Sequence, residues 1–506
     1  GRTTDFATAD TRVKADISMP LKDGLEFEDV DFDVLATARL VESSEIVPGR
    51  RLESEELQLV ANPDELQIRG DGALDGVPFD AEWRAGLGQS ASGTSSATGD
   101  VALSEQTLSA FGVDLPPETL RGEGTASYEL AIGPDDAATL KLSSDLRGLG
   151  ISIPALGWNK SPSASGGLDF SMELGGAPDV RQLDFSAPGL AFSGDVDFGE
   201  SGQLAQLRLD RLRVGQWLDA TARIRPRPGG APNISLVGGQ MDLRALPSAP
   251  EGQTKPRSDG APLSIDLDRV VVTDQISMSP FRGEVRPSLG GLDGDFEGRL
   301  SGSTLVRGSL VPAFGSTAVR VESDDAGGVL RDSGITRSGR GGEFYLVMSP
   351  VNGAPAGTYD GEFRISKMRL QDAPVLAGLL NAMSIVGLLD QLSGGGLGFD
   401  TIDGAFRMTP DSIVVLRFAA VGPSLGISAD GVYDPVDGEL DMQGVVSPIY
   451  FVNGIGSLLT RRGEGLFGFS YRLSGPTSAP TVSVNPLSIL TPGMFREIFR
   501  QPVPVE

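Results

Sequence analysis

The feature that most constrains this chain is an alternation of apolar and polar residues with a period of two. In the stretch 406–446, apolar residues fall on one side of an extended chain and Arg417 on the other; the apolar residues are Val414, Leu416, Phe418 and Ala420. Successive side chains of a β-strand point to opposite faces, so this period predicts strands with one apolar and one polar face. Gly-Pro and Asp-Gly pairs follow the alternating runs, which is typical of hairpin turns.

The same alternation recurs along most of the chain. We expect the apolar residues of these runs to share one face. Soluble proteins rarely leave a large continuous apolar surface bare, so this face needs an apolar guest, and extended acyl chains of lipid are the natural one. The candidate residues are Phe79, Trp83, Tyr128, Leu130, Leu168, Phe170, Met172, Leu174, Ile265, Leu267, Phe344, Leu346, Phe363, Ile365, Phe406, Val414, Leu416, Phe418, Leu425, Ile427, Leu440, Met442, Phe467, Phe469 and Tyr471.

Helical periodicity is scarce in this sequence. One amphipathic helix is predicted at 372–392, with shorter candidates at 106–111 and 494–499. So few helices cannot cover the apolar side of so many strands, which leaves packing against a second sheet or curling of the sheet itself. Tandem sandwiches remain an alternative, although the pattern runs on with few breaks. We therefore predict a mostly β fold: a long antiparallel sheet curled into an open groove, with a few short helices.

Three stretches rich in Gly, Pro and Ser are predicted to be flexible seams within one continuous architecture: 89–98, 225–233 and 248–262. They divide the chain into segments. The expected segments are β-groove portions at 1–98, 99–247 and 263–370, a flexible loop at 248–262, and a C-terminal portion at 371–506 that contains the helix 372–392.

Composition excludes several classes of function. The formal net charge is -26, from 42 basic and 68 acidic residues, which disfavours nucleic-acid binding by phosphate neutralisation. The sequence has no cysteine and no histidine, so thiolate chemistry and the commonest general base are excluded. We expect no cofactor and no metal. No apolar run approaches the ~18 residues of a membrane-spanning helix, and we interpret the chain, which begins with Gly1, as a soluble piece of a longer protein.

Three motifs suggest chemistry but have simpler explanations. The sequence "GPSLG" at 422–426 matches a nucleophile elbow, yet no histidine can activate its serine, so we expect a hairpin turn. The sequence "GGLGFDTID" at 395–403 matches a single calcium-binding nonapeptide, which functions only in tandem copies. The acidic run at 28–34 is expected to be the solvated side of a strand. We therefore predict that the chain is not an enzyme.

Several longer stretches resemble the AsmA-like superfamily, and most of all the C-terminal region of its YhdP type, among the bacterial repeating β-groove (bridge-like lipid transfer) proteins. They are "LKLSSDLRGLGISIPALGWNK" (140–160), "DDAGGVLRDSGI" (324–335), and the block 368–499, which contains "GPSLGISADG", "GVVSPIY", "GLFGFSYRLSGP" and "VNPLS". The family's N-terminal anchor helix has no counterpart here, and the loops at 225–262 fit none of its motifs.

The resemblance implies a periplasmic protein of Gram-negative bacteria, anchored in the inner membrane by a helix outside this chain. It implies non-enzymatic intermembrane phospholipid transport, with a hydrophobic groove that conducts acyl chains towards the outer membrane during outer-membrane biogenesis. The expected partners are phospholipids and the inner and outer membranes at the two ends; no protein partner is indicated.

Other functions stay open from the sequence. A scaffold or assembly factor for outer-membrane proteins, similar to the TamB type, is the main alternative. A glycan-acting enzyme and an adhesin of stacked sandwiches are the others. The helix at 372–392 could either cap the sheet or present its apolar stripe to lipid or to a partner.

Overall fold

The computed structural model describes residues 7–47, 49–88, 93–111, 115–116, 118–134, 137–174, 179–199, 204–227, 230–247, 260–288, 290–448, 461–477, 479–491 and 500. Strands dominate these residues and the helices are few and short. The predicted fold class, a mostly β chain built on long sheets, is therefore confirmed.

The chain divides into two compact units, which are described separately. The first unit comprises Gly1–Gly229 with Pro247–Ala249, and the second comprises Gly230–Leu246 with Pro250–Glu506. The division falls within the predicted seam 225–233, but strands run into this stretch from both sides. The predicted loop 248–262 lies almost entirely outside the described residues.

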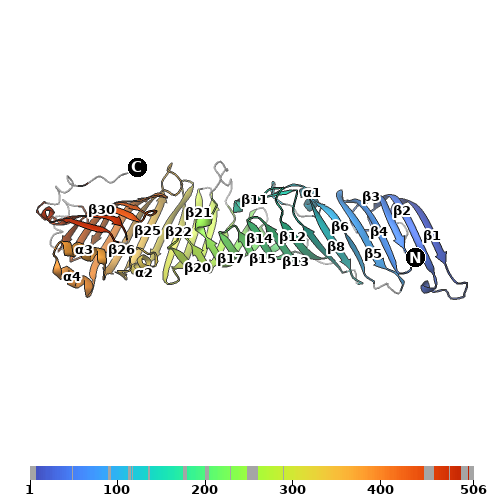
Figure 1. The fold of residues 1–506 in the computed structure, drawn as a ribbon, viewed down its shortest axis with the longest axis horizontal. Helices are drawn as coiled ribbons and strands as arrows, with labels where there is room; N and C mark the ends of the chain where they lie inside the picture. Colours follow the sequence, from blue (N-terminus) through green and yellow to red (C-terminus); the bar gives the residue numbers. More distant parts are fainter. Residues whose placement is uncertain are drawn as a thin grey trace. The chain divides into compact units, whose positions relative to one another are not determined.

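The first unit is built on a ladder of antiparallel strands, in which strands that follow one another in the sequence lie side by side (Figure 1). Its strands are β1 (Thr8–Ser18), β2 (Asp31–Ser43), β3 (Leu52–Ala61), β4 (Glu65–Leu74), β5 (Val77–Gly86), β6 (Ser95–Leu103), β8 (Gly124–Ile132), β9 (Ala138–Ser144), β12 (Gly167–Leu174), β13 (Asp179–Ala187), β14 (Leu190–Phe198), β15 (Leu204–Val214) and β16 (Leu218–Arg227). Every residue of the edge strand β1 is exposed.

A small second sheet and one short helix accompany this ladder. The small sheet pairs β10 (Leu149–Ile153) with β7 (Leu120–Gly122) and with β11 (Trp158–Lys160). Helix α1 (Glu105–Ala110) lies where the sequence predicts a short helix, and the Ser104 hydroxyl accepts a hydrogen bond from the Thr107 N–H at its start.

The second unit is also built on a ladder of strands with alternating apolar and polar residues. Its strands are β17 (Gly230–Asp242), β18 (Leu263–Leu267), β19 (Arg269–Val271), β20 (Ser277–Ser288), β21 (Gly291–Leu300), β22 (Thr304–Ala313), β23 (Ser316–Ser323), β24 (Gly339–Arg340), β25 (Glu343–Pro350), β26 (Tyr359–Leu370), β27 (Leu397–Met408), β28 (Ile413–Val421), β29 (Leu425–Asp434), β30 (Glu439–Pro448), β31 (Phe469–Pro476) and β32 (Thr481–Asn485). Strand β17 pairs in parallel with β18 and β19. The sheet is thus mixed, whereas the sequence led us to expect antiparallel pairing throughout.

The amphipathic stretch 372–392 forms two helices rather than the predicted single one. Helix α3 (Pro374–Ala382) is followed by α4 (Val386–Ser393). Between them Ser384 has a φ of 57°, and the Ile385 N–H donates to the Leu380 carbonyl at 3.0 Å, a bond that closes a helix end. A third helix, α2 (Ala326–Asp332), follows β23. The candidate helix at 494–499 lies outside the described residues.

Candidate functional site: the apolar sheet faces

In the first unit, the strand register brings the predicted apolar residues onto one face. Trp83 on β5 pairs with Ile68 on β4 and with Ala97 on β6, and Phe170 on β12 pairs with Leu142 on β9. Because residues opposite each other share a face, the alternations of separate strands merge into continuous apolar rows. All candidate residues of this unit lie on what we call the first apolar face: Phe79, Trp83, Tyr128, Leu130, Leu168, Phe170, Met172 and Leu174.

The protein itself covers part of the first apolar face, at one of its margins. At that margin Val77, Leu190 and Val214 are each 2% exposed. Trp158 of the small sheet packs there, with its ring edge-on to Phe185 at 6.0 Å between centroids. The candidate residues of this face, in contrast, are all half-buried, so their side chains are in contact with neighbours and still accessible from outside.

Tyr128 is the polar member of this face. Its hydroxyl donates a hydrogen bond to the Asp80 carbonyl at 3.0 Å. Burial, with the negative charges of Asp80 and Asp100, raises the pKa of the Tyr128 phenol to about 12. The phenol is therefore neutral at physiological pH, and its only polar atom is engaged within the protein.

The register of the second unit also gathers apolar residues on one face. Phe344 pairs with Ile365, which pairs with Ile402 across the next strand. The candidate residues on this second apolar face are Ile265, Leu267, Phe344, Leu346, Phe363, Ile365, Phe406, Phe418, Leu425, Ile427, Leu440, Met442, Phe469 and Tyr471.

A β-bulge in β28 moves two candidates off this face. Phe418 pairs with Gly404, but Val414 pairs with Arg407 on the polar face, because Leu416 is an extra residue without a partner on β27. One additional residue in a strand reverses the alternation beyond it. Val414 and Phe418 thus point to opposite faces, contrary to the sequence prediction, and Leu416 is 38% exposed at the bulge.

Phe467 also lies off the predicted face. It precedes β31 in a bend and is 55% exposed. Its neighbour in the alternating run, Phe469, is the first residue of the strand and pairs with Val446. The alternation in the sequence therefore begins before the strand does.

Part of the second apolar face is filled by the protein's own helices. Leu380 of α3 is 0% exposed and Leu392 of α4 is 2% exposed, and both belong to a core with Phe399, Ile402 and Val446 of the sheet. Helix α2 contributes Val329 to a second cluster, which contains Met278, Leu300 and Val306. The sequence predicts an open groove, whereas helices cover this part of the second apolar face.

Aromatic residues on the second apolar face lie over glycines of the neighbouring strand. Phe296 pairs with Gly308, and a Cβ on that glycine would lie 2.2 Å from the Phe296 ring. Phe363 stands in the same relation to Gly404, with a closest approach of 2.5 Å. A ring that occupies the place of a missing side chain lies along the sheet, so these aromatics cover the face without projecting far from it.

The opposite, polar face is crossed by pairs of arginine and carboxylate. Arg407 bonds Asp360 through two nitrogens at 2.8 and 3.0 Å, and Arg472 bonds Asp441 at 2.9 and 2.6 Å. The Arg472 hydrogen bond lowers the pKa of the Asp441 carboxyl. These pairs are on the surface, where each contributes little to stability, and they make this face strongly hydrophilic.

A buried ionic cluster on the polar face of β29 is not evident from the sequence. Arg500 contacts Asp430 at 2.9 Å and Glu464 at 2.5 Å, and the side chains of these three residues are 12%, 4% and 3% exposed. The Ser428 hydroxyl donates to Glu464 at 2.7 Å. These residues are separated by up to 72 positions, and no local motif joins them.

The motifs that suggested chemistry are parts of hairpins and strands. The sequence 422–426 joins β28 to β29 through a turn in which the Gly422 N–H donates to the Leu425 carbonyl at 2.9 Å. It leads from strand to strand, whereas an elbow leads from a strand into a helix. The sequence 395–403 runs into β27. Of the acidic run 28–34, Asp31 and Asp33 alternate along the start of β2, whereas Asp29 ends a short 3-10 helix (Phe27–Asp29) before the strand.

Comparison with known proteins yields no match: no family model matches the chain, and neither a curated protein nor a solved structure is significantly similar to it. Within the described ranges, the helices are all too short or too polar to cross a membrane.

Proposed function

We propose that the first apolar face, and the part of the second apolar face that the helices leave uncovered, bind the acyl chains of phospholipids, and that the protein conducts phospholipid between membranes without a chemical step. The observation that carries this proposal is the first apolar face. Its large side chains are aligned in register over successive strands, yet they are half-buried rather than enclosed. Soluble proteins rarely leave continuous apolar surface uncovered, and such surface marks a binding site.

An extended hydrocarbon chain suits this surface better than a compact ligand does. The apolar rows cross many strands, and on the second apolar face the rings that lie over glycines project little from the sheet. Transfer of hydrocarbon from water to such a surface is favourable by about 0.8 kcal/mol per buried methylene. Contacts of this kind do not depend on headgroup or on chain length, so we expect broad lipid selectivity.

The resemblance of 140–160, 324–335 and 368–499 to the AsmA-like superfamily supports the same proposal. Membership of that superfamily would place the protein in the periplasm, with an anchor in the inner membrane and a route to the outer membrane. In this proposal the polar headgroups stay in water at the open margin, and the acyl chains move along the face.

Photocrosslinking from adjacent residues of one strand tests the proposal. A photoreactive phenylalanine analogue is placed at 170, on the apolar face of β12, or at 171, on its polar face. After incubation with phospholipid vesicles, we expect lipid adducts from position 170 and none from position 171. Equal labelling at both positions, or no lipid adduct at 170, would contradict the proposal.

The same experiment in cells separates lipid transport from a scaffold function. Lipid adducts at 170 favour transport, whereas adducts to protein strands favour assembly of outer-membrane proteins. A second measurement is the phospholipid that copurifies with the chain. Met172→Glu introduces a charge on the apolar face and should reduce it, while Glu173→Gln on the polar face of the same strand should not.

A further inference from the structure

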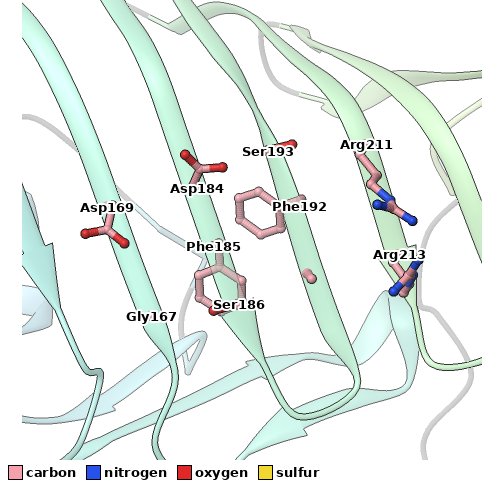
Figure 2. A pocket seen from close by; sticks show the side chains of 10 residues that line it. Gly167, Asp169, Asp184, Phe185, Ser186, Phe192, Ser193, Arg211 and Arg213 are labelled. Carbon is pink, nitrogen blue, oxygen red and sulfur yellow. The ribbon is translucent and has the colours of Figure 1, made fainter.

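A hollow on the polar face of the first unit has an uneven distribution of charge. It has a volume of about 240 Å³ and lies over β12 to β15, on the side away from the first apolar face. Figure 2 shows Asp169 and Asp184 on one side, Arg211 and Arg213 on the other, and Ser193 between them.

The strand register fixes this arrangement. One row across the sheet runs from Asp169 through Asp184 and Ser193 to Arg211. The next row contains Ser186 and ends in an arginine, Arg213. Neighbouring strands are about 4.8 Å apart, so the backbones of Asp184 and Arg211 are separated by about 10 Å. Hydroxyl groups thus lie between an acidic and a basic side.

The basic side has hydrogen-bond donors to spare. Arg211 and Arg213 both bond the single carboxylate of Asp219, at 3.2 and 3.1 Å. Each guanidinium carries five N–H donors, and one carboxylate engages only a few of these ten. Both side chains are exposed beside the hollow, so donors remain for an anion.

The two carboxylates of the acidic side lack a cationic partner among the described residues. Asp169 and Asp184 are directly opposite each other on β12 and β13. Within the described part of the chain, neither carboxylate has a cationic partner at ion-pair distance; Asp184 accepts only a 3.5 Å hydrogen bond from Gln182. Like charges directly opposite each other destabilise a strand pair, and a bound cation would relieve that repulsion.

We propose that this hollow binds a zwitterion that carries a phosphate and an ammonium group on a short linker, as in phosphoethanolamine. Arg211 and Arg213 hold the phosphate with help from the Ser186 and Ser193 hydroxyls, and the ammonium lies against Asp184 and Asp169. The site is on the opposite side of the sheet from the first apolar face. It is therefore independent of acyl-chain binding, and either proposal can fail without the other.

Calorimetric titration with separate fragments tests this assignment. The probes are O-phosphoethanolamine, inorganic phosphate and ethanolamine, added to the whole chain at low ionic strength, where exposed charges are least screened. We expect phosphoethanolamine to bind more tightly than either fragment. Inorganic phosphate that binds as tightly as phosphoethanolamine would reduce the site to an anion site and overturn the proposal.

Matched substitutions locate the binding. Arg211→Gln and Asp184→Asn should each weaken phosphoethanolamine about fivefold, the effect of losing one exposed ion pair. Arg225→Gln and Asp195→Asn change the same charges on the polar face outside the hollow and should leave the affinity unchanged. Equal effects in the two sets would show that only the general field of the face matters, and would overturn the site.

A cosedimentation experiment with vesicles shows whether the ligand is a membrane lipid or a soluble molecule. Cosedimentation with phosphatidylethanolamine vesicles that is lost in Arg211→Gln would assign the headgroup of a membrane lipid. Binding of free phosphoethanolamine without cosedimentation would assign a soluble ligand. Either assignment requires that free phosphoethanolamine binds in the calorimetric titration. If neither free phosphoethanolamine nor the vesicles bind the protein, the proposal is refuted.

Discussion

Phe406 lies directly opposite Gly361, and its ring occupies the space that a side chain on Gly361 would need. A Cβ at that glycine would be 2.2 Å from Cζ of Phe406. Neither residue is replaceable alone, because the ring fills the gap left by the glycine and the glycine gives the ring its place. The pair thus behaves as one packing unit on the second apolar face.

Substitution of this glycine tests the packing unit. We expect Gly361→Ala to lower the free energy of unfolding by about 1–3 kcal/mol, the usual cost of overpacking, measured by urea denaturation followed by circular dichroism. Gly398→Ala is the control, because a Cβ at that position meets no atom within 4 Å. The double variant Gly361→Ala/Phe406→Ala should be more stable than the sum of the single effects predicts. Strict additivity would contradict the account.

Helix α3 should stabilise the second unit through its buried stripe. Leu380 is 0% exposed between the helix and the sheet, so Leu380→Ala should cost about 2–5 kcal/mol of unfolding free energy. Val386→Ala, at the start of the neighbouring helix α4 and at a residue that is 63% exposed, should change stability by less than about 0.5 kcal/mol. Equal midpoints for the two variants in thermal denaturation would show that the helix does not pack as described.

The phenol of Tyr128 should add a pH dependence to the first unit. Its pKa in the folded chain is raised to about 12 from the ordinary 10.0. Between these values the unfolded chain loses the proton while the folded chain keeps it, so this contribution to stability is complete below about pH 10 and is lost as the pH rises towards about 12. Tyr128→Phe should unfold with a smaller loss of stability over this interval.

Tyrosinate absorbance provides the direct reading of that pKa. We expect the wild type to contain a phenol that titrates at about 12 and that is absent from Tyr128→Phe. Tyr471, whose pKa burial also raises, remains in both proteins and serves as the internal reference. A Tyr128 phenol that titrates at its ordinary value would contradict the burial described here.

Arg500 should be far more important for stability than the arginines of exposed pairs. Its removal takes this cationic partner from Glu464, which is 3% exposed, and leaves Asp430, which is 4% exposed, with the longer 3.6 Å contact to Arg461. Breaking a buried pair in this way costs about 3–5 kcal/mol, so Arg500→Met should lower the urea midpoint strongly. Arg472→Met is the control and should cost at most about 1 kcal/mol, since that side chain is 49% exposed. Similar losses would argue against a buried cluster.

The alternation in the sequence predicts strands and faces well because both follow from one geometric rule. Trp83, Phe170 and Phe363 lie on the expected faces, since each belongs to an uninterrupted strand. The rule fails at Leu416, where one extra residue reverses the alternation and no glycine or proline announces it. Ser384 likewise ends a helix with a positive φ that serine rarely adopts.

Other features depend on contacts that no local pattern encodes. The parallel pairing of β17 with β18 depends on where the chain returns after a long connection. The cluster of Arg500 joins residues far apart in the sequence, and the filling of the second face by α3 and α4 depends on where two helices dock. The periodicity of the sequence describes each segment by itself and does not predict contacts between segments that are far apart in the chain.

The ladder arrangement also has a consequence for how such a chain can change in length. Each strand touches chiefly the strand before it and the strand after it, as the units of a solenoid do. Gain or loss of a whole hairpin preserves the direction of the chain and the orientation of every remaining side chain, whereas gain or loss of a lone strand does not. Proteins that descend from one ancestral gene could therefore differ by two strands at a time, while every remaining side chain stays on its original face of the sheet.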